Sequence, residues 1–458
     1  MRSEIIVAGA GHGGLITSIK LAKKGYNVHI FERKKNIEDI SWDWCDVFDI
    51  NVFERIKLPK PDKSLYDIPI NSYFVSPDEK HELYIDLPVE KRGISMDRRN
   101  LIKYLIEFAK DAGVNIHLNE KVDTPIIKEK KIIGLKLKTS EVKGDLIIDS
   151  AGINTPIRTQ LPESYGLNKS MKRGEIFYTY RAYYNKLAGD SYVKVYLGYD
   201  YKPGICWVNT SNGCADVLIG YIDHFTKEEL NEQINSLKLK HSTIGNELLR
   251  GGIIADIPIR RTAPMLVGDN YAVIGDAAFM ATPMSGSGIA NSMIAGDILA
   301  NTIINSEGNF GERFNISKLW PYQVKYYQEI GCNMAFVEVI KNFIIGLKNL
   351  QGIDFLFDKK IITASDIRSS LEGNELKIKV FDLLRRGIRG LKKFRIVLQL
   401  AKALNNGDKA REHFFNIPEI YDYKEVNNWI MKGNRFFTEF YKKMESIPNL
   451  PLTKKNMK

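Results

Sequence analysis

Cysteine is scarce in this chain of 458 residues, and its few thiols are widely spaced. No two of them form a C-x-x-C pair, so neither a disulfide scaffold nor a cysteine-based metal site is predicted, and we expect no metal. A reducing compartment is the simplest consequence, so we expect a cytoplasmic location, with peripheral attachment to a membrane left open. The four cysteines are Cys45, Cys206, Cys214 and Cys332.

Long apolar runs and internal repeats are also lacking. One uncharged window, Ala277–Gly296, has the length of a membrane span, but Pro283 and Asn291 make its transfer into hydrocarbon unfavourable. Apolar residues make up 44% of the chain and charged residues 26%, as in an average globular protein. Disordered and fibrous proteins are therefore excluded, and a substantial buried core is expected.

Positive charge is unevenly distributed along the chain. Lys and Arg number 66 against 55 for Asp and Glu, and residues 377–411 alone contain eleven Lys or Arg residues and two Asp. There the basic residues alternate with Leu, Ile and Phe at helical spacing, a pattern that suits docking on an anionic membrane surface. A helical bundle with a basic solvent face explains the pattern equally well. No nucleic-acid partner is expected, because no recognised binding module accompanies the charge.

The periodicity of apolar residues changes along the chain. Residues 4–32 predict a strand, a helix and a second strand, whereas residues 175–222 alternate between apolar and polar as in an antiparallel sheet. From residue 271 the first pattern returns, and beyond Leu319 nearly everything is helical in period. Further expected elements are a strand pair within 68–94, helices over 99–112 and 226–238, strands near 114–118, 132–138 and 145–149, and helix breaks near Gly352, Gly373, Gly407 and Pro418.

This order predicts a mixed α/β and α+β fold. A Rossmann-type dinucleotide domain is interrupted by an antiparallel β substrate domain and is followed by a C-terminal helical region. The expected boundaries are 1–60, 95–165 and 265–318 for the dinucleotide domain, 61–94 and 166–264 for the substrate domain, and 319–458 for the helical region.

A glycine-rich turn follows the first expected strand. Gly9, Gly11 and Gly14 form the pattern G-x-G-x-x-G, which permits a tight turn, a close approach of pyrophosphate and close packing of helix on strand. The helix N-terminus offers free N–H groups to phosphates. Glu32 can accept hydrogen bonds from ribose hydroxyls, and it disfavours NADP because it repels a 2′-phosphate. The remaining cofactor-binding candidates of this segment are His12, whose role as a mere spacer stays open, Gly13 and Arg33.

A second glycine-rich loop follows the strand expected at 271–275. The pair Gly275-Asp276 ends the strand, and Pro283–Ile289 opens a helix whose N-terminus also suits anions. NAD needs one such fingerprint, whereas the longer FAD must be held at both ends, so we expect FAD. Asp276 would bind the ribityl hydroxyls, and the N–H groups after Gly286 would face the N1–C2=O edge of the flavin. The candidates are Gly275, Asp276, Pro283, Ser285, Gly286, Ser287, Gly288 and Ile289.

Together these motifs resemble a known fold. The two loops, with Asp97–Leu101 between them and Asp149–Gly152 followed by Arg158, are similar to the FAD-dependent fold of p-hydroxybenzoate hydroxylase and its relatives. Within that group, Pro283–Ile289 with Gly296 after it most resembles the geranylgeranyl reductase family. Members of that family use reduced FAD to saturate the double bonds of isoprenoid chains.

The resemblance implies roles for particular residues. Arg98 would approach the pyrophosphate or adenosine of FAD, and Ser285–Gly288 would lie against the isoalloxazine ring. The reductases carry a cysteine that faces the flavin pocket after the first βαβ unit, and Cys45 falls in that region; a small buried hydrophobe is the open alternative. On the substrate sheet, the reductases show aromatic-x-Trp-x-Phe-Pro, of which this chain keeps Trp207 and lacks the rest.

Acidic residues surround Cys45 in the sequence. Asp43, Asp46 and Asp49 could supply a proton, because burial raises the pKa of a carboxyl group, although solvated loop acids remain the alternative. Trp42, Trp44 and Trp207 belong to segments expected to cover the flavin, and aromatic walls suit an apolar or planar ligand. The catalytic candidates are Cys45, Asp46 and Trp207.

We therefore expect an FAD-dependent oxidoreductase that reduces carbon–carbon double bonds of an isoprenoid or other apolar substrate by hydride transfer from flavin N5. Because FAD occupies the only fingerprint, the electron donor is external, either NAD(P)H or a ferredoxin. The alternatives are a flavin-dependent monooxygenase of the hydroxylase or halogenase type and a non-redox, flavin-assisted hydratase or cyclase.

Overall fold

The computed structural model describes residues 3–167, 171–211, 213–306, 314–347, 350–371, 383, 386 and 393–446. It has two halves in space, each built on one large sheet, and a six-stranded sheet forms the core of the first. The sheet order is β18-β19-β12-β1-β2-β8, and all neighbours are parallel except β18 and β19. Parallel strands place their carboxyl ends at one edge, so the loops after β1 and β19 emerge at the same edge of the sheet, with the end of β12 between them. The strands are β1 (Glu4–Ala8), β2 (Asn27–Glu32), β8 (Asn115–Leu118), β12 (Leu146–Asp149), β18 (Val267–Gly268) and β19 (Tyr271–Val273).

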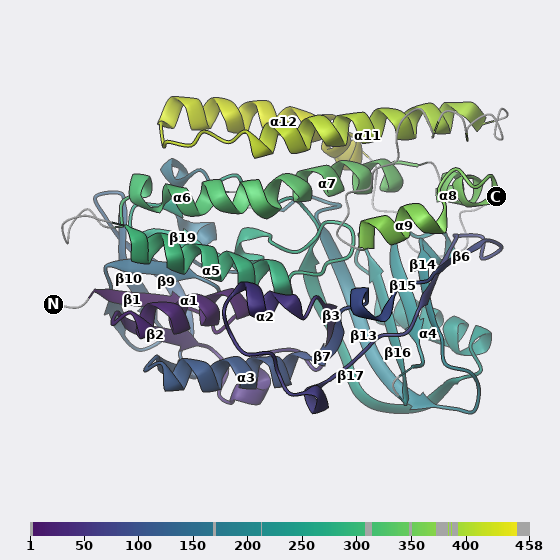
Figure 1. Cartoon of the computed structure of the whole chain (residues 1–458), viewed down its shortest axis with the longest axis horizontal. Coiled ribbons are helices and arrows are strands. Elements are labelled where there is room, and N and C mark those ends of the chain that lie inside the picture. Colours follow the sequence, from purple (N-terminus) through teal and green to yellow (C-terminus); the bar gives the residue numbers. More distant parts are fainter. Residues whose placement is uncertain are drawn as a thin grey trace.

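Helices and two small sheets surround this core (Figure 1). Helix α1 packs against both α5 and α3, and in Figure 1 α5 lies above α1 and α3 below it. The small sheets have the orders β11-β10-β9 and β3-β7-β4. The elements are α1 (His12–Lys23), α2 (Asn51–Arg55), α3 (Arg98–Asp111), α5 (Ile289–Asn305), β3 (Cys45–Phe48), β4 (Tyr66–Asp67), β7 (Ile94–Asp97), β9 (Val122–Lys128), β10 (Lys131–Leu137) and β11 (Glu141–Lys143).

A seven-stranded sheet forms the second half, in the order β17-β13-β16-β15-β14-β5-β6. Helix α4 covers one face, where Ala182, Tyr184 and Cys206 are buried. Because side chains alternate along a strand, Arg181 and Tyr183 project from the other face. The elements are β5 (Ser72–Val75), β6 (Glu82–Ile85), β13 (Ile176–Lys186), β14 (Val193–Leu197), β15 (Gly204–Asn209), β16 (Cys214–Tyr221), β17 (Ile244–Pro258) and α4 (Lys227–Lys240).

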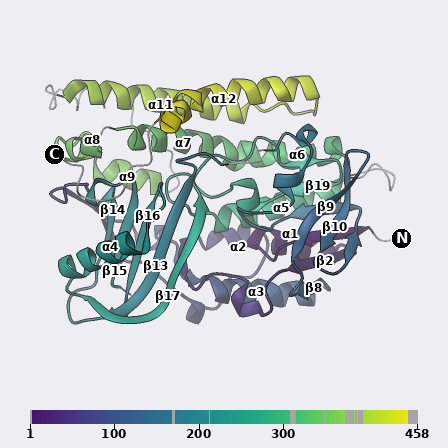
Figure 2. The same cartoon turned by 180° about the vertical axis from the view of Figure 1, so that it is seen from behind.

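Helices make up the described part of the chain after Phe314. Figures 1 and 2 show α11 and α12 as an outer layer over α6 and α7, spanning both halves. Among the described residues, no helix is both long and apolar enough to cross a membrane. The helices are α6 (Ile316–Tyr326), α7 (Cys332–Ile345), α8 (Gln351–Asp358), α9 (Ala364–Leu371), α11 (Phe394–Phe415) and α12 (Tyr423–Ser446).

The expected helix break at Gly407 is wrong, because Gly407 lies buried inside α11. A Cβ there would lie 2.8 Å from Cδ2 of Phe336 on α7, so this glycine permits close helix packing instead of a break. The break at Pro418 is confirmed between α11 and α12. Gly373 and much of the basic segment 377–411 lie outside the described residues, which include Leu383, Arg386 and 393–411 of that segment.

Candidate cofactor and active site

The first glycine loop rests directly on the end of β12. Gly9 adopts φ +84°, and a Cβ on it would lie 2.7 Å from the carbonyl oxygen of Ser150. A Cβ on Gly11 or Gly14 would lie 2.7 Å from Oγ of the same serine. Helix α1 begins here with no side-chain cap and no acidic residue in its first turn. Its free N–H groups therefore form a cradle for an anion that side chains cannot fill.

Glu32 fixes the position of this loop from the end of β2. One carboxylate oxygen accepts a hydrogen bond from the Ala10 N–H at 2.9 Å, and the other accepts from the Lys34 N–H at 3.0 Å. The side chain is buried beside the loop, where a ribose would lie in the predicted arrangement. Arg33 is exposed, and no interaction tests its predicted role.

The second loop closes on itself before α5. The Gly286 N–H donates to the Thr282 carbonyl and the Thr282 N–H donates to the Ser287 carbonyl, both at 2.8 Å. Gly286 has φ +72°, and a Cβ on it would lie 2.9 Å from Cγ2 of Ile257 on β17. Gly288 precedes α5 without any side-chain cap. Of the remaining candidates here, Pro283 and Ile289 are buried and Ser285 and Ser287 are exposed.

Two glycines, Gly13 and Gly296, allow α1 and α5 to approach each other closely. A Cβ on Gly296 of α5 would lie 2.5 Å from the carbonyl oxygen of Gly13 on α1, and a Cβ on Gly13 would lie 2.7 Å from Cδ1 of Ile274. Thr17 Oγ1 bonds both glycine carbonyls, at 2.9 Å and 3.2 Å. Two uncapped helix N-termini that begin far apart in sequence thus lie at one sheet edge, as a ligand gripped at both ends requires.

A charged cluster lies between the two loops. The guanidinium of Arg98 pairs with Asp46 and lies 4.9 Å from the ring of Trp42. Burial, and then the charge of Arg98, lower the pKa of His12 to about 3, so His12 is neutral. Burial raises the pKa of Asp276, and Arg98 opposes this change. These effects place His12 and Asp276 within the electrostatic reach of Arg98.

Buried polar atoms without a protein partner also mark this region. His12 Nε2 and Trp44 Nε1 are both inaccessible to solvent and form no hydrogen bond within the described residues. A buried polar group without a partner is costly, so each calls for a ligand atom. Together with the two glycine cradles, these atoms fit FAD, with polar groups available at both loops and in the cluster between them.

Asp46 differs from the expectation that burial raises its pKa. Burial by itself acts in that direction, but Arg98 and then Arg181 outweigh it, and the pKa lies below its ordinary value. The expectation of a raised pKa is therefore wrong for Asp46, while its predicted catalytic role stays a prediction. Of the neighbouring acids, Asp43 pairs with arginines and Asp49 is exposed.

Cys45 begins β3 opposite Asp97 of β7. Its backbone N–H donates to the Tyr183 hydroxyl on the substrate sheet at 2.7 Å. Burial raises the pKa of the thiol to about 11, while Arg250 and Arg181 act in the opposite direction. Cys45 therefore holds its proton at neutral pH.

Trp207 lies on the sheet face opposite α4, because its neighbours Cys206 and Val208 belong to the core under that helix. The guanidinium of Arg181 lies 4.9 Å from the Trp207 ring and binds Asp216 in a bidentate pair at 2.8 Å and 2.7 Å. Arg181, Asp216 and Arg250 were not among the predicted site residues. An arginine among the tyrosines of residues 178–184 was the available signal, since a buried charge on a strand calls for a partner.

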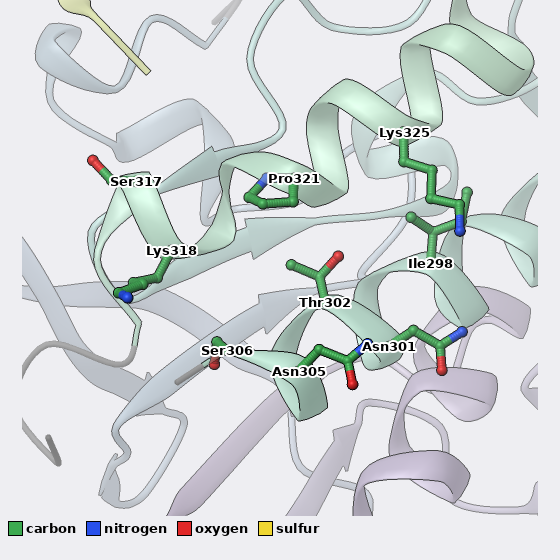
Figure 3. Close-up of a pocket in the computed structure, with 9 residues that line it drawn as sticks. All are labelled: Ile298, Asn301, Thr302, Asn305, Ser306, Ser317, Lys318, Pro321 and Lys325. Atoms are coloured by element: carbon green, nitrogen blue, oxygen red, sulfur yellow. The ribbon is translucent and has the colours of Figure 1, made fainter. Parts of the chain in front are cut away.

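A surface groove between α5 and α6 contains none of the predicted site residues (Figure 3). Figure 3 shows that its lining residues come from α5, from α6 and from Ser306 after α5. It is separate from the glycine loops, which precede α1 and α5. Its lining residues are Ile298, Asn301, Thr302, Asn305, Ser306, Ser317, Lys318, Pro321 and Lys325.

Comparisons with known proteins find solved structures with a similar fold and curated relatives of similar sequence. No protein-family model matches the chain. The solved structure of a geranylgeranyl bacteriochlorophyll reductase-like protein from Thermoplasma acidophilum is similar, with a TM-score of 0.68 at 18% identity over 83% of this chain and 99% of that one. A flavin-dependent brominase is similar with a TM-score of 0.58 at 15% identity over 86% of this chain and 100% of that one.

Among curated proteins, the digeranylgeranylglycerophospholipid reductase of Sulfolobus acidocaldarius is 22% identical over 97% of this chain and 99% of its own length. These likenesses confirm the predicted fold class and the predicted resemblance to the geranylgeranyl reductases. The word reductase in two of these names agrees with the predicted oxidoreductase class, and the name of the brominase agrees with a flavin as the predicted cofactor.

Proposed function

We propose that this chain is an FAD-dependent oxidoreductase that saturates carbon–carbon double bonds of an isoprenoid lipid. The observation that carries this proposal is that α1 and α5 both begin after a glycine loop without a side-chain cap. The charged cluster beside them contains buried polar atoms that have no hydrogen-bond partner among the described residues. The similarity over nearly the whole chain to a digeranylgeranylglycerophospholipid reductase supports the substrate class. The proposal also keeps the domain boundaries predicted from the sequence, with the cofactor bound by the dinucleotide domain and the substrate by the antiparallel sheet domain.

Bound FAD would supply the hydride for one alkene carbon. The α1 N-terminus would bind the pyrophosphate with Arg98 nearby, and Glu32 would bind the adenosine ribose. Asp276 would bind the ribityl chain, and the α5 N-terminus would face the ring edge where negative charge gathers.

Protonation of the other alkene carbon falls to a group that still holds a proton at neutral pH. Cys45 meets this condition, whereas Asp46 is held ionised by two arginines. Trp207 would form an apolar wall beside them, on the same sheet face as Arg181. Cys45 is therefore the proton donor in this proposal, and Asp46 orients Arg98 and Arg181.

The electron donor is external in this proposal, either NAD(P)H or a ferredoxin. Peripheral attachment to an anionic membrane is a further part of it, because an isoprenoid lipid resides there and the described basic residues of 393–411 lie on α11. Vesicle co-sedimentation with and without anionic lipid tests this attachment, and equal binding to neutral vesicles would contradict it.

The reaction can be tested by anaerobic mixing. The flavin of the purified protein is reduced and then mixed with a digeranylgeranyl glycerophospholipid, while flavin absorbance is followed. Reoxidation without oxygen, together with a saturated product, supports the reductase. Reoxidation that requires oxygen and gives a hydroxylated or halogenated product would instead make the chain a monooxygenase. Product formed without any net change in flavin redox state would indicate a hydratase or cyclase.

A variant of Cys45 separates its catalytic role from packing. Cys45→Ser should slow alkene-dependent reoxidation at least tenfold, because a hydroxyl is a much weaker acid, while flavin content stays unchanged. Cys206→Ser is a poor control because Cys206 is fully buried in the core. The control is therefore Asp49→Ala, which changes an exposed residue near Cys45 in the sequence. Unchanged kinetics in Cys45→Ser would return this residue to a packing role.

A further inference from the structure

Segment 42–46, which carries Cys45, is attached to the substrate sheet by two arginines. Arg250 of β17 reaches Asp43 of the segment and Asp97 of β7, each with an N–O distance of 2.7 Å. Arg181 of β13 lies 3.7 Å from Asp46 while it holds Asp216 in a bidentate pair. The segment and the arginines are more than 130 positions apart in the chain, so only the fold brings them together.

Both guanidinium groups also flank Tyr183. The ring of Tyr183 lies 4.7 Å from the guanidinium carbon of Arg250 and 5.3 Å from that of Arg181. The hydroxyl of the same tyrosine accepts the Cys45 N–H at 2.7 Å. A backbone contact thereby holds Cys45 at the hydroxyl of a tyrosine that two cations flank, and the β3–β7 ladder places Asp97, a partner of Arg250, directly opposite Cys45.

We propose that Arg250 and Arg181 are positioning residues that hold segment 42–46 against the substrate sheet and stabilise the negative charge left on the Cys45 sulfur after proton transfer. This inference rests on the proposed function for its catalytic meaning. The S–H bond breaks, a C–H bond forms on the alkene carbon that receives no hydride, and the electron pair stays on sulfur. Water later returns the proton to the sulfur. The hydride and its electron pair come from the reduced flavin.

Charged groups of both signs face Cys45. The cations are Arg250 on β17 and Arg181 on β13, and the anions are Asp97 on β7 and Asp216 on β16. Each of these two carboxylates is already paired with one of the two arginines. Replacing Arg181 by a neutral side chain removes a cation and leaves Asp216 without this partner. Replacing Arg250 removes a cation, while Asp97 keeps Arg99 at 3.2 Å. The loss of either cation disfavours a thiolate.

Alkylation of the thiol tests this proposal without any substrate. The full-length, flavin-loaded protein is treated with iodoacetamide between pH 7 and 10, and the modification of Cys45 is followed by peptide mass spectrometry. Because the thiolate is the nucleophile, the rate reports the thiolate fraction. We expect Arg250→Gln to slow alkylation of Cys45 about threefold to tenfold at each pH, which corresponds to roughly half to one unit of thiol pKa.

Matched variants separate charge from structure. Arg250→Lys keeps the positive charge and should retain most of the wild-type rate. Arg173→Gln removes another bidentate arginine, which precedes β13 in the chain and binds Asp223 at 2.6 Å and 2.7 Å, and this variant should leave the Cys45 rate unchanged. Arg181→Gln should slow alkylation as Arg250→Gln does, and its flavin content checks that it folds.

The direction of the change decides the outcome. An equal or faster rate in Arg250→Gln, with wild-type flavin content, would overturn the proposal, because a segment that is merely loosened becomes more accessible. A decrease of the Cys45 alkylation rate in Arg173→Gln that is as large as the decrease in Arg250→Gln would overturn the proposal as well. If no alkene is reduced by the wild-type protein, the proposed function fails, yet the alkylation result still decides whether the arginines stabilise the thiolate.

Discussion

The two glycine loops and the junction with the C-terminal helices are built by opposite means. The loops are held by close backbone contacts at glycines, where an added Cβ would collide with the neighbouring segment. Their one side-chain support is the Glu32 carboxylate, which accepts a hydrogen bond from the Ala10 N–H. At the junction, Glu338 of α7 pairs with Arg261 at 3.1 Å and accepts a hydrogen bond from Tyr441 of α12. Lys341 of α7 donates to the carbonyls of Gly174 at 2.7 Å and Ile259 at 2.5 Å.

This difference follows from what each region must do. The loops must leave N–H groups free for a ligand, so side chains are kept away from them. The junction lies where the chain enters β13 and leaves β17, and there buried charges tie both connections to α7 and α12. A buried charge is tolerated only with its partner, so this network is sensitive to the loss of any one member.

The largest effect is expected at the junction. Glu338→Gln should lower the free energy of unfolding by about 3–5 kcal/mol, because it leaves Arg261 buried without a counter-charge. The arginine holds the pKa of Glu338 at about 2 against the effect of burial. Chemical denaturation at pH 7 measures the change.

The pH dependence of the same variant gives the control. The folded pKa of Glu338 is lowered, so its contribution is complete above the ordinary pKa near 4.5 and fades as the pH falls toward 2. The difference from wild type should therefore shrink below pH 4.5. Glu329→Gln, which removes a half-exposed partner of Arg55, should cost less than about 1 kcal/mol. Equal costs for the two variants would refute the contrast.

The next effect concerns the glycine loop. Gly9→Ala should cost about 3 kcal/mol and abolish flavin binding, because the new methyl group meets the Ser150 carbonyl in addition to the strain of a positive φ. Gly25 has a similar φ of +88° with nothing within 4 Å, so Gly25→Ala isolates the strain at about 1 kcal/mol. Thermal unfolding measures the loss of stability in each variant, and flavin absorbance measures the bound cofactor. If the two alanines behaved alike, close packing at Ser150 would have no role.

A smaller effect is expected at the second loop. Asp276→Ala should weaken FAD binding about tenfold to thirtyfold, or about 1.4–2 kcal/mol, through the loss of hydrogen bonds to the ribityl chain. Fluorescence titration of the apoprotein with FAD measures this, and the exposed Asp49→Ala serves as control. Wild-type affinity in Asp276→Ala would remove the ribityl role.

The smallest effect is expected at a purely local feature of the substrate sheet. Thr226 and Glu229 form a reciprocal capping box at the start of α4. Thr226→Ala should lower the free energy of unfolding by about 1 kcal/mol, and Thr226→Ser should restore most of it, because both hydroxyls accept the N3 N–H. A loss as large as that of Glu338→Gln would mean that α4 is coupled to the junction.

The sequence predicted the elements whose signals are local. The βαβ start, the helix over 226–238 and the helix after Gly288 all appear close to their expected positions. Strand β17 was missed because its exposed Leu248 and Leu249 and its two consecutive glycines interrupt the alternation that marks a strand. The predicted helix break at Gly407 is wrong, because a glycine that admits a neighbouring helix looks the same in sequence as one that ends a helix.

By itself, the sequence determined the fold class, both glycine loops and the acid at the end of β2, because backbone sterics and apolar period act over a few residues. Only the tertiary structure decided the charge states at the site and the identity of their partners. The pKa of Asp46 is lowered because Arg98 and Arg181 outweigh the effect of burial, whereas the pKa of Cys45 is raised because burial outweighs Arg250 and Arg181. This balance between desolvation and Coulomb attraction depends on distances that the chain acquires only when folded.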